Sequence, residues 1–95
     1  MAGIATEDSI CSGHDGFPPR KAVEGDASFI INGIPAHVDG MAWDFHSKPD
    51  NPPHNGVGIG EGSFFINGKP ACLIGSPVSC GSVIATGDES FNIAG

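Results

Sequence analysis

The chain is poor in positive charge. Four lysines and arginines stand against 11 aspartates and glutamates, which gives a formal net charge of −7 over 95 residues. Because binding to a phosphate backbone requires clustered cations, this composition argues against a nucleic-acid partner. It equally disfavours an anionic membrane surface as a resting partner. The acidity instead suits solubility, or a partner with a basic face.

Long apolar runs, a leader and a disulfide framework are also missing. No apolar run approaches the roughly 18 residues of a transmembrane helix. The segment Met1–Asp8 has neither the basic part nor the apolar core of a signal peptide, so we expect the protein to be made in a cytoplasm. The three cysteines, Cys11, Cys72 and Cys80, cannot all pair, and in a reducing compartment they are thiols or metal ligands.

Helix signals are scarce, because 15 glycines and 8 prolines interrupt almost every stretch of the chain. The best candidate for a single helical turn is residues 41–46. Trp43 and the phenylalanines are expected to form the core, yet only 39% of the residues are apolar. We expect residues 1–95 to form one domain that needs a staple beyond its hydrophobic core.

The strongest internal signal is a repeat. Gly25–Ala36 aligns with Gly60–Ala71, a constant offset of 35 residues, and a shorter copy covers Gly87–Ile93. Each full copy has a run of β-formers followed by Asn-Gly, the dipeptide that suits the two positive φ angles of a type I′ hairpin. The proline after the turn belongs at a sheet edge or a strand start. Each copy is therefore predicted to be a β-hairpin.

Hairpins of this size are not stable alone in water, so the copies must pack on one another. The N-terminal residues are candidates to complete the third copy. The sequence thus predicts an all-β fold, a stack of β-hairpins with pseudo-threefold character.

Histidines gather in the two irregular stretches outside the copies, residues 9–19 and 46–58. The candidate metal ligands are His14, His46, His54 and Cys80, each in a loop beside glycine, proline or serine. Three imidazoles and a thiolate complete a tetrahedral Zn²⁺ site, which would be structural and contribute on the order of 10 kcal/mol to folding. Their spacing matches no common zinc motif, so the histidines also fit ordinary solvent-facing loop positions.

Other donors have competing interpretations. Cys11, three residues before His14, could replace one of the four ligands or act as a small buried hydrophobe. His37 and Cys72 directly follow Pro-Ala at equivalent places in two copies, which favours a role on the hairpin surface or in the core. The carboxylates fall mostly in turns, and GxSxG, P-loop and HExxH motifs are absent, so no catalytic residue is assigned.

Taken in order, these pieces resemble the PAAR-repeat proteins, named for a Pro-Ala-Ala-Arg motif. The resemblance covers nearly the whole chain and rests on four segments: Ser12–Gly16, Phe29–His37, Phe64–Cys72 and Val78–Gly87. His37 and Cys72 stand where the family motif leads on to arginine, so the arginine and the second alanine are lost. Whatever that arginine contributes in the family is in doubt here.

The resemblance implies a compact cone with Zn²⁺ near its vertex, and position by position its ligands match His14, His46, His54 and Cys80. It implies a structural tip that caps and sharpens a trimeric β-helical, membrane-puncturing spike. The tip would be monomeric and dock by its base on a partner of the central tail-spike or valine-glycine-repeat type. It would touch the target membrane only transiently.

The expected location is the tail tip of a phage virion, assembled in the host cytoplasm, or alternatively the tip of a type VI secretion apparatus. Because no effector domain follows in the sequence given, the phage tail is slightly favoured. The main alternative is a small zinc-dependent hydrolase, with His14, His46 and His54 as ligands and water in the fourth position. A third is a β-rich carbohydrate-binding module.

Overall fold

A computed structural model describes residues 2–60 and 64–93, and every regular element in this part of the chain is a β-strand. The predicted all-β class is therefore confirmed. The strands are short and pair in twos: β1–β6, β2–β3 and β4–β5. Their bounds are β1 Ala2–Ile4, β2 Asp26–Ile31, β3 Ile34–Ala36, β4 Phe65–Ile66, β5 Lys69–Pro70 and β6 Asp88–Ile93.

The pairs β2–β3 and β4–β5 are the hairpins that the repeat predicted. The φ angles of the turn residues are 51° and 83° at Asn32 and Gly33, and 51° and 78° at Asn67 and Gly68. Both turns therefore have the two left-handed residues of a type I′ hairpin, as the Asn-Gly dipeptides predicted. Residues 61–63 of the second copy lie outside the described residues.

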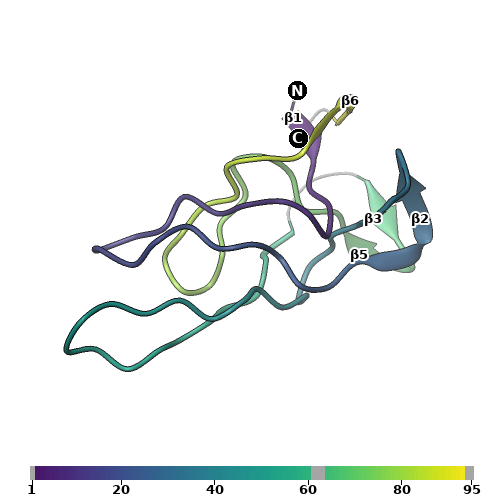
Figure 1. Ribbon diagram of the computed structural model, residues 1–95. Coiled ribbons are helices and arrows are strands. Elements are labelled where there is room, and N and C mark those ends of the chain that lie inside the picture. The colour runs from purple at the N-terminus through teal and green to yellow at the C-terminus, as the bar shows by residue number, and fades with distance from the viewer. Residues whose placement is uncertain (1, 61–63, 94–95) are drawn as a thin grey trace.

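The two terminal strands form the third copy. They pair like the strands of a hairpin although no turn joins them, and this pair is counted below as the third hairpin. Strand β1 pairs antiparallel with β6, with Ala2 opposite Ile93 and Gly3 opposite Asn92. The expectation that N-terminal residues complete the third copy is thus confirmed. Figure 1 shows the consequence, since strands β1 and β6 lie side by side at the same edge of the molecule.

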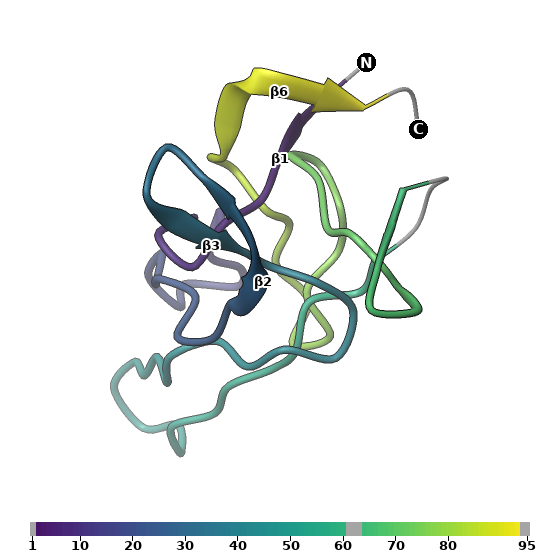
Figure 2. The same cartoon turned by 90° about the vertical axis from the view of Figure 1, so that its right-hand side faces the viewer.

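The three hairpins are related by a closed ring of backbone hydrogen bonds. The N–H of Ala5 donates to the carbonyl of Cys72 (2.8 Å), that of Cys72 to His37 (3.0 Å), and that of His37 back to Ala5 (2.9 Å). Each of these residues follows the second strand of its hairpin, and each is fully buried. The ring ties every copy to both others, so the pseudo-threefold arrangement is built into the main chain (Figure 2).

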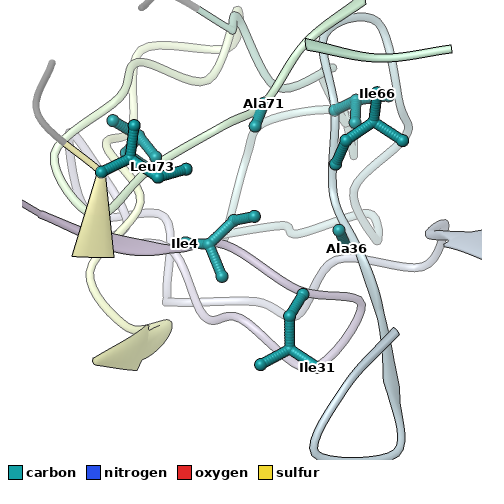
Figure 3. Close-up of a cluster of buried hydrophobic side chains, with 8 residues drawn as sticks. Ile4, Ile31, Ala36, Ile66, Ala71 and Leu73 are labelled. Carbon is teal, nitrogen blue, oxygen red and sulfur yellow. The ribbon is translucent and has the colours of Figure 1, made fainter. Parts of the chain in front are cut away.

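Beneath the hairpins lies a small apolar core. Ile4, from the third copy, is 0% exposed and lies among the labelled side chains of the other two copies in Figure 3. Full burial of one such side chain stabilises the fold by about 1.5–3 kcal/mol. The buried members are Ile4, Ile31, Ala36, Val38, Ile66, Ala71, Leu73 and Ile93.

The phenylalanines only partly follow the prediction that they form the core. Phe29, Phe64 and Phe91, one from each copy, meet with ring centroids 5.3–5.4 Å apart and are half-buried. Phe45 and Phe65 are 57% and 59% exposed, so for them the prediction is wrong. Side chains alternate between the two faces of a strand, so Phe65, next to the buried Ile66, must face outward.

A second buried cluster continues the core away from the hairpins. It includes Trp43, which is 2% exposed, as predicted. The other members are Ala5, Cys11, Ala22, Cys72, Val78 and Ile84. The predicted helical turn at residues 41–46 is wrong: this segment is extended, with bridges from Ala42 to Val57 and from His46 to His54.

The molecule is elongated, with extents of 39 × 23 × 22 Å. Its strand pairs gather at one end, here called the hairpin end, and loops around residues 12–18 and 46–54 reach to the opposite loop end (Figure 1). This all-β, tapering arrangement fits the expected cone. The described residues include no helix long and apolar enough to cross a membrane.

Candidate metal centre

His46 and His54 are brought together by an extended arm of the chain. Each backbone N–H donates to the carbonyl of the other, at 2.9 and 3.1 Å, and Trp43 donates to Gly56 further along the arm. Directly opposed residues in an antiparallel pair place their side chains on the same face. The eight-residue separation in the sequence therefore becomes a direct cross-strand pair of imidazoles.

His14 is also positioned by an antiparallel pair, here a short one in which a tight turn joins His14 to Phe17. Asp15 and Gly16 have φ angles of 45° and 84°, the left-handed pair of a type I′ turn. Across this turn His14 and Phe17 exchange backbone hydrogen bonds at 3.1 and 2.6 Å. The side chains of His14 and Phe17 consequently lie next to each other.

Cys80 reaches the histidines from a tight third loop. The loop is fixed to the histidine arm because Ser79 N–H donates to the carbonyl of Val57 and Val57 N–H donates to Ser79 Oγ, both at 2.9 Å. The close approach requires a glycine: a Cβ added at Gly56 would lie 2.8 Å from the backbone nitrogen of Cys80. On its other side Cys80 packs against the second buried cluster.

The structure places all four predicted donors in one cluster. The ligand atoms of His14, His46, His54 and Cys80 all lie within 4.8 Å of one another, and within the described residues this is the one such group that could hold a metal ion. The three imidazole Nε2 atoms are separated by 2.8, 3.0 and 3.3 Å. Zn–N bonds of about 2.0–2.1 Å in a tetrahedron would put such nitrogens about 3.3 Å apart.

Protonation at the cluster suits metal binding. His46 is buried, and its Nδ1 lies 2.9 Å from the carbonyl of Pro18. A carbonyl only accepts, so Nδ1 carries the proton and Nε2 presents its lone pair to the cluster, the usual arrangement for a ligating histidine. Partial desolvation, then the imidazoles of His46 and His14 and the ammonium of Lys48, lower the pKa of His54, which favours its neutral form.

One residue of the cluster was missed from sequence. The Phe17 ring contacts all three imidazoles, with centroid separations of 5.1 Å to His14, 5.0 Å to His46 and 4.3 Å to His54. The available signal was Asp15-Gly16, because a type I′ dipeptide makes its flanking residues cross-strand neighbours. Phe17 was expected only to be part of the hydrophobic core.

The other sulfur and nitrogen donors lie elsewhere. Cys11 is 3% exposed within the second buried cluster, where its Sγ accepts a hydrogen bond from the N–H of Arg20. It behaves as the small buried hydrophobe that was one of its two interpretations. His37 and Cys72 are fully buried at the centre of the hairpin ring, which places them in the core.

Comparison with known families decides the assignment. The family model of the PAAR motif matches residues 18–86, which is more than half of the chain. The chain belongs to the PAAR family. No curated protein gives a significant match.

PAAR membership fits the all-β fold and the histidine–cysteine cluster, and it favours a structural role over a zinc hydrolase. The family is structural rather than enzymatic, and it is associated with the tips of phage tails and of type VI secretion systems. Its motif is incomplete here, since His37 and Cys72 follow Pro-Ala in the two full copies. Both side chains are enclosed, so these positions serve packing around the backbone ring instead of presenting a charge.

Proposed function

We propose that this PAAR protein is the structural tip of a trimeric β-helical, membrane-puncturing spike. Its hairpin end docks on the blunt end of the spike, and its loop end points forward. The observation that carries the proposal is the closed ring of three quasi-equivalent hairpins. A single chain with this arrangement can cover a true threefold surface and protect its exposed strand edges.

The side chains at the hairpin end indicate what such a partner must offer. Ile30 and Phe65, on equivalent strands of two copies, are 55% and 59% exposed, whereas the third strand has the exposed polar residue Asn92. Asp26 and Asp88 begin two of these strands. A partner with apolar sites near its axis and basic residues around them would complement this end.

The metal centre would give the loop end its rigidity. We infer that His14, His46, His54 and Cys80 bind Zn²⁺, since three imidazoles and one thiolate are donors that zinc prefers. Four protein ligands leave no position for a reactive water, which supports a structural role and argues against a zinc hydrolase. Elemental analysis of the purified protein tests the identity of the ion.

Docking is tested by calorimetry with trimeric β-helical spike proteins of the central tail-spike and valine-glycine-repeat types as probes. The expected result is one monomer per trimer. Ile30→Asn and Phe65→Asn should each weaken binding about tenfold, because each removes one buried apolar contact. Asn92→Ile should strengthen it, since a symmetric trimer offers the same apolar site a third time.

A matched control is Val83→Asn, which changes an apolar side chain that is 44% exposed but lies outside the hairpin strands. It should leave the affinity unchanged. No binding to either class of spike would refute the docking proposal. Equal effects of the hairpin and control variants would refute the assigned surface. The preferred location remains the phage tail tip, with the type VI apparatus as the alternative.

A further inference from the structure

We propose that Phe17 and Lys48 form a clamp that retains the metal ion at the loop end. The inference rests on the metal binding proposed above and goes beyond it, because neither residue is a ligand. The clamp would control how quickly the ion escapes, while the four donors determine that it binds.

Phe17 is placed as a common cover for the three histidines. Its ring is nearly parallel to that of His14, at 29°, and meets that of His54 at 60°. An apolar ring against all three imidazoles keeps water and competing ligands from the bonds that must break during release. The type I′ turn at Asp15-Gly16 fixes the ring there through the backbone.

Lys48 joins this cover to the second loop. Its ammonium lies 4.7 Å from the centroid of the Phe17 ring, within the range of a cation–π contact. The same ammonium donates a hydrogen bond to the backbone carbonyl of Asp15. A side chain from the His46–His54 loop therefore holds the His14 turn from outside.

The Lys48 stem runs close along the outside of this turn. A Cβ added at Gly16 would lie 3.4 Å from Cδ of Lys48, an ordinary contact distance, so it is the φ of 84° at Gly16 that favours glycine there. The turn therefore depends on glycine, and the lysine stem packs beside it. Since the loops that carry His14 and His46 must separate before the ion escapes, a bridge between them slows that step.

The test measures the release of zinc to an excess of a colorimetric chelator from the full chain. Phe17→Ala should accelerate release at least tenfold, whereas Phe17→Tyr, which keeps the ring, should stay within about twofold of the parent. Lys48→Met keeps the stem but loses the charge, and should accelerate release about two- to fivefold, the equivalent of one exposed cation–π contact. Phe65→Ala is the control, a phenylalanine at the hairpin end that should change nothing.

The outcomes separate this inference from the proposed function. If the parent protein contains no metal when purified and takes up none when zinc is added, the metal site itself is refuted. Stoichiometric metal, with Phe17→Ala and Lys48→Met both releasing it at the parental rate, refutes the clamp alone. If Phe17→Ala does not fold, Lys48→Met and the tyrosine variant decide. A cobalt-substituted sample of each variant should keep its tetrahedral absorption spectrum, because the ligands are unchanged.

Discussion

Removal of the metal by a chelator is expected to lower the midpoint of thermal unfolding by about 20 °C. A ligand at about 1,000 times its dissociation constant stabilises the folded state by about 4 kcal/mol. For a domain of this size each kcal/mol shifts the midpoint by about 5 °C. The donors come from three loops between His14 and Cys80, and their ligand atoms lie within 4.8 Å of one another, so a bound ion would tie these loops together. The loops should therefore separate on chelation.

Differential scanning calorimetry of zinc-loaded and chelated protein measures this shift, with circular dichroism as a second probe. Cys80→Ser should abolish most of the zinc-dependent part of the stability. The matched control is Cys11→Ser, a buried cysteine outside the cluster, which should lower stability yet keep the full response to zinc. A chelated parent that melts within about 2 °C of the loaded one would show that the fold needs no staple.

Three further predictions concern the body of the fold. Gly58→Ala should destabilise the protein by about 1–3 kcal/mol, because a Cβ there would lie 2.6 Å from His37 Nε2 and 3.0 Å from Cys72 Sγ; urea unfolding measures this. Burial lowers the pKa of His37 from its ordinary value of 6.5, so its ring should stay neutral below pH 6.5 by NMR. The unfolded chain then binds more protons than the folded one, and stability should fall as the pH drops below 6.5. Asn32→Gly, which preserves the turn but removes the amide that bonds Asp88 at 2.6 Å, should cost about 1 kcal/mol in urea unfolding.

Each of these has a control and a contrary outcome. Gly40→Ala, at a glycine with no atom near its Cβ position, separates backbone strain at φ 84° from the overpacking expected at Gly58. A His37 titration midpoint at or above 6.5 would contradict its burial. The control for Asn32→Gly is Asn51→Gly, which removes a side-chain amide that bonds the carbonyl of Pro49 within its own loop. If both variants lose the same stability, the bond from Asn32 to Asp88 does not stabilise the contact between copies.

Several features were readable from the chain because the forces behind them are local. Asn32-Gly33 and Asn67-Gly68 predicted type I′ hairpins, since few other residue pairs tolerate two positive φ angles. The 35-residue repeat predicted hairpins that must pack together, because no single copy can bury its apolar face. The four candidate donors were also named from the sequence, although their role as ligands stays a prediction.

The sequence-based predictions were wrong or incomplete where contacts between distant segments determine the local structure. Residues 41–46 were assigned a helical turn from local pattern, but pairing with residues 54–58 holds them extended. Phe17 looked like a core residue, and only the convergence of three loops reveals that it lies against the imidazoles.

The sequence by itself determined the turns, the repeat and the kinds of donor atom available, since these depend on the φ preferences and side-chain chemistry of neighbouring residues. The sequence named the N-terminal residues as candidates to complete the third copy and named four candidate donors. Only the tertiary structure decided the register in which β1 pairs with β6 and the loop contacts that bring His14, His46, His54 and Cys80 together. The physical reason is that both arrangements depend on backbone hydrogen bonds between segments far apart in the chain, which no local preference encodes.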